Sequence, residues 1–345
     1  MTDNDGAPVL EVEGLVKHYR GGSALRRAAV VRAVDGVDLT IRPGEILGLV
    51  GESGSGKSTV GKCLTRLATP TAGAVRLLGR DISALGRRRM RPLRRDVHMI
   101  FQDAYSSLDP RRTVGDIVAG PLREHRIGSP AERRRTAAEL MEKVGLPERL
   151  AARYPHELSG GQRQRVAFAR ALSTGPRLVV ADEPVSALDI SVQAAILNLL
   201  LDLRADAGFS CLFITHDLSV AEFICDRIAV MYLGKIVETA SREDLFARPR
   251  HPYTQALLSA APVPDPGRGR AGTRVVLGGE PPSPADRIGG CPFHPRCPVA
   301  EDRCRTDVPA PAAAAPGHLV SCHLVTPDGG PDITRGRNGI VHHTS

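Results

Sequence analysis

The sequence predicts an α/β fold, in which short apolar strands alternate with helices. Three observations support this class. Strand-like and helix-like patterns alternate up to about residue 240, a Gly-rich loop at 51–59 joins a strand to a helix, and a second apolar strand at 178–181 ends in two carboxylates. A chain of 345 residues is long enough for about two domains and for a sizeable core.

The order of the elements follows from the same patterns. We expect strands at 9–16, 34–41, 45–50, 74–78, 96–101, 178–181, 211–215 and 228–232, and helices at 57–67, 132–144, 162–172 and 191–204. After about residue 260 the chain becomes rich in Pro, Gly and Arg, and residues 310–316 form an Ala/Pro run. We therefore expect one domain at 1–260 and an extension at 261–345.

Composition excludes several classes of protein. Hydrophobic residues make up 42% of the chain, yet no stretch approaches the ~18 consecutive apolar residues of a membrane helix. The polar, acidic start at Met1 to Asp5 does not resemble a secretory signal, which indicates the cytosol. The net charge of +8 could favour nucleic acid, but 3% aromatic residues and no Trp argue against a base-stacking surface.

The Gly-rich loop has the P-loop pattern in its proper setting, after a strand and before a helix. Its residues are Gly51, Glu52, Ser53, Gly54, Ser55, Gly56, Lys57, Ser58 and Thr59. The backbone N–H groups of such a loop surround phosphate oxygens, and the helix dipole favours their charge. Lys57 is expected to reach the β- and γ-phosphates and Ser58 to bind Mg²⁺. A chance match has a likelihood on the order of one in a hundred for a chain of this length.

Two further motifs fit a nucleotide site. Asp182 and Glu183 end the strand at 178–181; the first carboxylate would complete the Mg²⁺ shell and the second would polarise the attacking water. Ser159, Gly160, Gly161 and Gln162 open a helix and form a second anion site. One nucleotide rarely needs two such sites in one chain. A dimer in which each copy's helix contacts the nucleotide of the other copy explains both.

With these motifs in this order, the sequence resembles the ATP-binding subunits of ABC transporters over roughly residues 8 to 325. The resemblance implies an ABC-type nucleotide-binding domain of the P-loop NTPase class, with a RecA-like sheet core, a helical subdomain at about 103–173, and a small irregular Cys-rich extension. It implies that Gln102 links the γ-phosphate and Mg²⁺ to the transport subunits. His216 would contact the γ-phosphate, Tyr19 would stack on adenine, and Ser186 to Asp189 would face a second ATPase domain.

Longer stretches resemble the dipeptide and oligopeptide permease ATPases. They are residues 101–111, 182–189 and 251–258, although Ala104 stands where that family usually has Pro. The resemblance implies an ATPase subunit of a peptide importer, on the cytoplasmic face of the membrane. Its implied partners are a related second ATPase chain, two permease chains and, indirectly, a solute-binding protein. Nucleic acid is not among them.

Four of the seven Cys residues crowd into the extension, at Cys291, Cys297, Cys304 and Cys322. Four thiols in a Pro-rich segment that is poor in apolar residues indicate a metal staple. Zinc sites usually bring ligands in pairs two to four residues apart, and this spacing lacks them. Iron–sulfur clusters accept longer spacings, and the family resemblance implies a [4Fe–4S] cluster on these four residues. Zinc and an unmetallated tail remain open.

Two other function classes stay open at this level. A soluble ABC ATPase that acts on nucleic acid or ribosomes uses the same fold, but this chain has a single nucleotide domain and no long coiled-coil insertion. A nucleotide- or redox-sensing module would use the cluster for regulation. The leading hypothesis is ATP hydrolysis coupled to import of peptides or similar small solutes.

Overall fold

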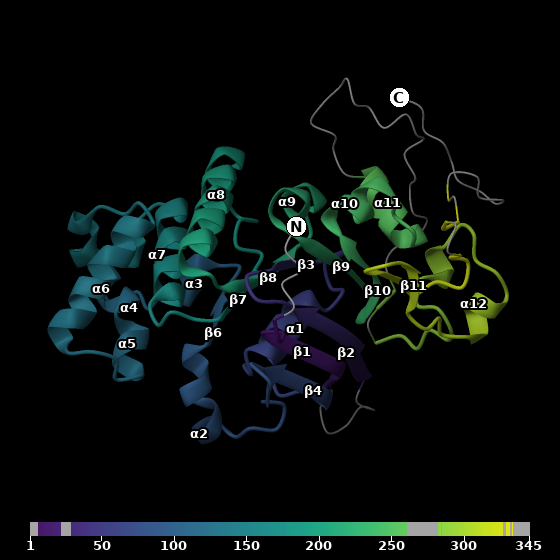
Figure 1. Ribbon diagram of the computed structural model, residues 1–345, viewed down its shortest axis with the longest axis horizontal. Helices are drawn as coiled ribbons and strands as arrows, with labels where there is room; N and C mark the ends of the chain where they lie inside the picture. The colour runs from purple at the N-terminus through teal and green to yellow at the C-terminus, as the bar shows by residue number, and fades with distance from the viewer. Residues whose placement is uncertain are drawn as a thin grey trace.

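The computed structural model describes residues 6–21, 29–260, 282–283, 285–326, 329–331 and 333. Its described part is built around an eight-stranded sheet of order β11-β12-β10-β9-β3-β8-β7-β6 (Figure 1). Its strands are β3 (Ile46–Val50), β6 (Val97–Ile100), β7 (Leu178–Asp182), β8 (Ser210–Thr215), β9 (Arg227–Tyr232), β10 (Lys235–Ser241), β11 (Ala312–Ala315) and β12 (His318–Val320). The run from β9 to β6 is parallel, and β10, β12 and β11 add to it antiparallel.

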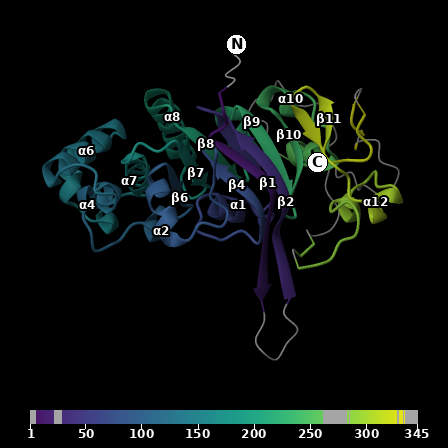
Figure 2. The ribbon, with the colours of Figure 1, turned by 60° about the horizontal axis from the view of Figure 1, so that its bottom comes forward.

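A second, antiparallel sheet has the order β2-β1-β4-β5. Its strands are β1 (Leu10–Gly21), β2 (Ala29–Ile41), β4 (Ala72–Leu77) and β5 (Arg80–Asp81). β1 and β2 are longer than predicted because their pairing continues past Tyr19 and Val31 to Gly21 and Ala29. Figure 2 shows them as a long ribbon that projects from the body of the protein.

The longer helices lie close to their predicted positions. They are α1 (Lys57–Leu64), α6 (Pro130–Lys143), α7 (Gly160–Leu172) and α8 (Ile190–Ala207). α1 ends before the predicted residue 67, because the Thr65 hydroxyl donates to the carbonyl of Gly61 and Arg66 adopts a left-handed φ of 55°. The N-terminal ends of α6 and α7 are set by local signals, since Ser129 and Ser159 each form a reciprocal capping box.

The remaining α-helices were not predicted, and most of them offer too few turns for a clear hydrophobic period. They are α2 (Arg87–Met90), α3 (Ala104–Ser107), α4 (Val114–Val118), α5 (Gly120–Glu124), α9 (Leu218–Ile224), α10 (Arg242–Ala247), α11 (Pro252–Ala260) and α12 (Arg303–Thr306). The segment from α3 to α7 gathers on one side of the molecule in both views. It runs from residue 104 to residue 172, and the family resemblance implies a helical subdomain at about 103–173.

Both faces of the parallel sheet are buried. On β3, Ile46 and Val50 point into a core shared with α7 and α8, and Leu47 and Leu49 point into a core shared with α1 and the antiparallel sheet. This accounts for the continuous apolar run of β3, since strands covered on both faces do not alternate with polar residues. The phosphate loop therefore starts from the fully buried middle of the sheet.

The extension is less irregular than the sequence predicts. β12 pairs with β10, and β11 with β12, so the extension enlarges the central sheet (Figure 1). Glu238 of β10, 1% exposed, accepts hydrogen bonds from Nε2 of His318 and from the backbone N–H groups of Arg250 and His251, at 2.7 to 2.9 Å. The Ala/Pro run at 310–316 has a composition typical of a loop, yet its residues 312–315 form β11, which is held by its pairing with β12.

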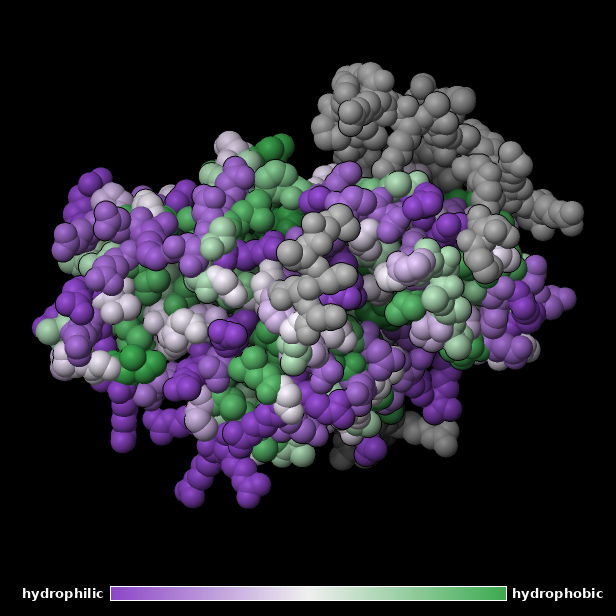
Figure 3. Space-filling view, in the orientation of Figure 1, coloured by the Kyte–Doolittle hydropathy of each residue, from purple (hydrophilic) through white to green (hydrophobic). Residues whose placement is uncertain are grey.

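The surface is strongly basic at one place. Arg87, Arg88 and Arg89 of α2 are exposed, and Figure 3 shows long hydrophilic side chains projecting where α2 lies in Figure 1. Within the described ranges, no helix is long and apolar enough to cross a membrane.

Candidate functional site

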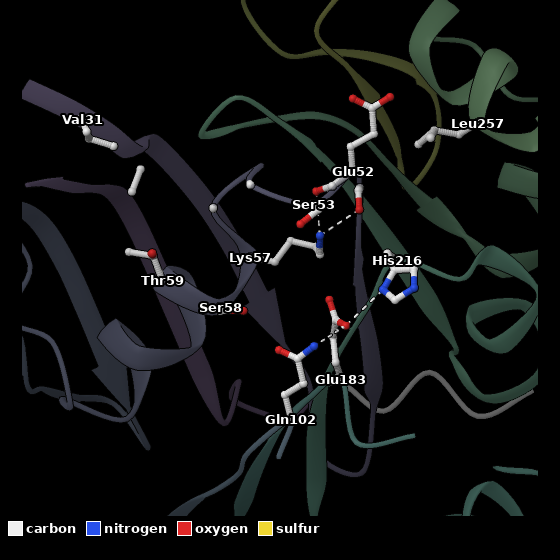
Figure 4. A pocket seen from close by; sticks show the side chains of 14 residues that line it. Val31, Glu52, Ser53, Lys57, Ser58, Thr59, Gln102, Glu183, His216 and Leu257 are labelled. Atoms are coloured by element: carbon white, nitrogen blue, oxygen red, sulfur yellow. Dashed lines mark hydrogen bonds and ion pairs between the residues drawn. The ribbon is translucent and has the colours of Figure 1, made fainter. Parts of the chain in front are cut away.

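A cavity of about 620 Å³ opens at the end of the parallel strands, around the start of α1 (Figure 4). Its lining comes from the phosphate loop, β2, the ends of β6, β7 and β8, and α11. The lining residues are Val31, Ala33, Gly51, Glu52, Ser53, Gly54, Gly56, Lys57, Ser58, Thr59, Gln102, Glu183, His216 and Leu257. The sequence predicted most of them. A cavity of this size suits a nucleotide.

Two glycines allow the loop to pack closely on neighbouring strands. A Cβ at Gly56 would lie 2.0 Å from the carbonyl oxygen of Ala33 on β2, and one at Gly51 would lie 2.2 Å from that of Met231 on β9. A side chain at either position would therefore displace the loop from the sheet. Gly56 is also in a left-handed conformation, with φ 108°, which glycine adopts at little cost.

Lys57 is held inside the loop that precedes it. Its side chain is buried, and its Nζ donates to the carbonyl oxygens of Gly51 and Glu52 at 2.8 and 2.9 Å. Burial lowers the pKa of Lys57, and the nearby charges of Glu183, Asp182 and Glu52 oppose that shift. The ammonium group thus lies at the cavity wall, where a phosphate would offer it a stronger acceptor than a carbonyl.

Ser58 and Asp182 meet where α1 and β7 approach each other. Ser58 Oγ donates to Asp182 Oδ1 over 2.8 Å. Burial raises the pKa of Asp182, and the hydrogen bond from Ser58 counteracts it. Mg²⁺ prefers a few oxygen ligands and keeps several waters. The hydroxyl of Ser58 and the carboxylate of Asp182 fit this ion, and Gln102, which lines the same cavity as Ser58, has an amide oxygen of the same kind.

Glu183 connects two other predicted residues. Its Oε2 accepts a hydrogen bond from Nε2 of Gln102 at 3.1 Å and lies 3.1 Å from Nδ1 of His216 (Figure 4). The backbone of Glu183 has a left-handed φ of 47°, although it is not glycine. Strain of this kind is characteristic of functional sites. It turns the carboxylate from the end of β7 toward the cavity.

The helix-opening motif lies elsewhere. Ser159 accepts from the N–H of Gln162 at 3.3 Å, and Gln162 Oε1 accepts from the N–H of Ser159 at 3.0 Å. Gly160 and Gly161 approach Leu188 and Val192 instead, on the loop and helix that follow Glu183. None of these four predicted residues lines the cavity.

Three other predicted binding residues are not at the cavity wall. Tyr19 does not line it; its ring lies under Nζ of Lys17, 4.8 Å away, and its partner across the strands is Val31, which does line it. Ser55 is buried within the loop, where its carbonyl accepts from the N–H of Gly234. Asp182 reaches the site through Ser58.

Other residues of the site carry no motif signal. Val31, Ala33 and Leu257 supply apolar wall, and small or aliphatic residues on a strand or helix look like ordinary core. Tyr253 and Arg296 contact Glu52 from 201 and 244 residues further along the chain. Only the fold brings them to the loop.

The four Cys residues of the extension gather in one region. The N–H of Cys291 donates to the carbonyl of Cys304 at 2.9 Å. Burial raises the pKa of Cys297 to about 12 and of Cys322 to about 11, and nearby Cys side chains add to both shifts. Across the described residues, no three His, Cys, Asp or Glu side chains are arranged to hold a single metal ion. Thiolates around one zinc would lie about 3.8 Å apart.

Comparisons with known proteins agree with this geometry. Residues 34–186 match the family described as ABC transporter, and residues 237–304 match the oligopeptide/dipeptide transporter C-terminal region. A probable peptide ABC transporter ATP-binding protein of Sinorhizobium fredii is 51% identical over 92% of this chain and 90% of its own length. The oligopeptide transport ATP-binding protein AppF of Bacillus subtilis is 46% identical over 94% of this chain and 99% of its own.

Solved structures give the same result for the fold. A dimeric ATP-binding cassette in a post-hydrolysis state, bound to ADP and Pi, superposes with a TM-score of 0.61 and 34% identity. The match covers 68% of this chain and 98% of that cassette. CbiO1 of Clostridium perfringens, part of an ABC transporter complex, gives a TM-score of 0.59 and 26% identity, over 70% of this chain and 91% of its own.

Proposed function

The chain belongs to the ATP-binding proteins of peptide and oligopeptide ABC transporters, and from that premise we propose that it hydrolyses ATP to drive import of peptides or similar small solutes. The observation that carries this proposal is the meeting of Gln102 and His216 at the carboxylate of Glu183, in the same cavity as Lys57 and Ser58. These groups are what phosphoryl transfer to water requires.

Lys57 and the loop N–H groups would bind the phosphates, with Lys57 moving from the two carbonyls to phosphate oxygens. Ser58, Asp182 and Gln102 would hold Mg²⁺, which neutralises charge on the phosphates when it is bound. Glu183 would orient the attacking water and accept its proton. His216, held beside Glu183, would donate a hydrogen bond to the γ-phosphate.

The second ATPase domain is part of this proposal. The Ser159–Gln162 motif does not line the cavity of its own chain. We propose that the N–H groups of Gly160 and Gly161, at the start of α7, contact the nucleotide of a partner. Ser186 to Asp189 lie between that motif and Glu183, where Leu188 approaches Gly160. We propose a related but different ATPase chain as this partner, as the family resemblance of the sequence implies, together with two permease chains that carry the solute.

The described residues hold no helix able to cross a membrane, and we place the chain at the cytoplasmic face of the membrane, as a peripheral subunit. The permease chains would supply the path through the bilayer. A solute-binding protein would select the cargo.

We also propose that Cys291, Cys297, Cys304 and Cys322 hold a [4Fe–4S] cluster as a structural staple of the extension. The support is that the N–H of Cys291 donates to the carbonyl of Cys304 at 2.9 Å and that Cys291, Cys297 and Cys304 pack in or against one core cluster. A four-iron cluster spreads its thiolates over several irons, so it does not need the tight set of donors that one zinc ion needs.

Purification of this chain from gently solubilised membranes, by an affinity tag, tests the transport function. We expect two permease chains and a second ATPase to accompany it. Recovery only in the soluble fraction, with nucleic acid or ribosomal proteins attached, would contradict import while leaving ATP hydrolysis in place.

A further inference from the structure

Every polar group of Glu52, the second residue of the phosphate loop, has a partner. Its N–H donates to Oη of Tyr253 at 2.9 Å, and its carbonyl accepts from Nζ of Lys57 at 2.9 Å. Its carboxylate accepts from both terminal nitrogens of Arg296, at 2.9 and 3.2 Å. Figure 4 shows this carboxylate turned away from Lys57. Two of the three groups are therefore fixed by residues from the C-terminal third of the chain.

Arg296 is unlike a surface arginine. Its side chain is only 7% exposed, against 26% for Glu52, and its guanidinium lies 6.0 Å from the ring centre of Tyr232. Two parallel N–H···O bonds to one carboxylate fix both the distance and the direction of the pair. Exposed ion pairs contribute little to stability because solvent screens them. The pair of Arg296 and Glu52 is shielded from solvent, so it fixes the orientation of the Glu52 side chain.

An aromatic cluster holds Arg296 and Tyr253 in place. The rings of Tyr232 and Tyr253 are 4.6 Å apart between centres, and Phe293 lies 5.3 Å from Tyr232 and 5.4 Å from Tyr253. Phe293 is three residues before Arg296 and is almost fully buried. The extension is thus anchored directly behind the loop, and the Arg296 side chain that contacts Glu52 is itself packed against this cluster.

We propose that Arg296 and Tyr253 are positioning residues of the ATP site, which hold the backbone of Glu52 so that the first half of the phosphate loop is preformed. This inference rests on the ATP site of the proposed function. Lys57 must exchange the carbonyls of Gly51 and Glu52 for phosphate oxygens, and a loop that is already ordered loses less entropy when the nucleotide binds. Neither residue touches the nucleotide in this proposal.

Loss of the contacts that Arg296 and Tyr253 make with Glu52 would weaken ATP binding more than it slows the chemical step. The groups that act on the γ-phosphate, Glu183, Gln102 and His216, are held by other contacts. A purely structural role for Arg296, in seating the extension, would instead lower thermal stability and leave the KM for ATP unchanged. The split between KM and kcat therefore separates the two roles.

The test compares Arg296→Gln, Glu52→Gln, the double variant and Tyr253→Phe in the full chain. Arg305→Gln is a matched control, because Arg305 is exposed and adjoins Cys304 as Arg296 adjoins Cys297. We expect Arg296→Gln to raise the KM for ATP and the Kd of a fluorescent ATP analogue about tenfold, or about 1.4 kcal/mol. We expect kcat to stay within about twofold, and the double variant to be no worse than the worse single variant, because both changes break one pair.

A KM for Arg296→Gln close to that of Arg305→Gln, or additive effects in the double variant, would overturn the proposal. If Arg296→Gln does not fold, Arg296→Lys keeps the charge but not the two-point contact. It should then give an intermediate KM, and a wild-type KM would overturn the proposal. Failure of the unaltered chain to bind ATP would refute the proposed function itself.

Discussion

Nδ1 of His216 lies 3.1 Å from Oε2 of Glu183, at the rim of the cavity that the phosphate loop closes. The two residues end neighbouring parallel strands, β8 and β7, whose carboxyl ends meet at one edge of the sheet. That edge is where open α/β sheets bind their ligands. The contact places a carboxylate and an imidazole together at the wall of the cavity that the phosphate loop also lines.

Glu183→Gln should abolish turnover while ATP still binds. Glutamine keeps the shape of the side chain but cannot accept a proton from water, so we expect kcat to fall at least a hundredfold. ATP would then hold two ATPase domains together, which size-exclusion chromatography with and without ATP would detect. Glu222→Gln, an exposed change on α9, should have no effect. Near-normal turnover by Glu183→Gln would contradict its catalytic role.

Ser159→Ala tests the role of the helix-opening motif in the partner's site. It should remove the cap of α7, at a cost of about 1 kcal/mol in the free energy of unfolding, and also prevent ATP-driven association of the two domains. Nucleotide binding by the isolated chain should persist, because Ser159 does not line the cavity.

Ser129→Ala is the control for this prediction, since Ser129 forms the same reciprocal capping box at α6. It should lose similar stability and still associate with ATP. If both variants associate normally, the motif does not act on a partner's nucleotide.

Features that depend on a short stretch of sequence, such as a motif or an apolar strand, could be predicted from the sequence alone. The sequence predicted the loop at 51–59 and the two carboxylates at the end of β7, and the family resemblance pointed to Gln102 and His216. That both side chains contact Glu183 is seen only in the structure. The sequence patterns did not predict β10, because the alternation of Lys235–Ser241 is broken by Glu238, which is charged yet almost fully buried. From the sequence alone a glutamate is expected to be exposed, because the three groups that donate hydrogen bonds to Glu238 are not apparent there.

The ion pair of Arg296 with Glu52 could not be predicted from the sequence, for a different reason. Arg296 is one of many arginines in the chain, and the segment around it is rich in Pro and Cys, so nothing local marks it. Its partner is 244 residues away. Contacts of this range depend on how the whole chain packs, which periodicity and spacing do not encode.

The iron and sulfide content of the protein tests the proposed cluster on the cysteines of the extension. After anaerobic purification we expect about four iron and four sulfide per chain and a brown band near ~400 nm. Cys297→Ser should lose both, whereas Cys63→Ser should keep them, because Cys63 is buried in α1, in the other core cluster. One zinc per chain, with neither iron nor the band, would contradict the cluster in favour of a thiolate zinc site.

Glu238→Ala should release the extension from the sheet. The carboxylate accepts from His318 and from two backbone N–H groups, and all of them would lose their acceptor inside the protein. Breaking a buried pair of this kind costs about 3 to 5 kcal/mol, which chemical denaturation would measure, and proteolysis should cleave near β12 sooner. Glu243→Ala on α10, where the side chain is exposed and pairs with Arg242, should change stability little. Equal stability of the two variants would show that the β10 and β12 pairing holds without this buried carboxylate.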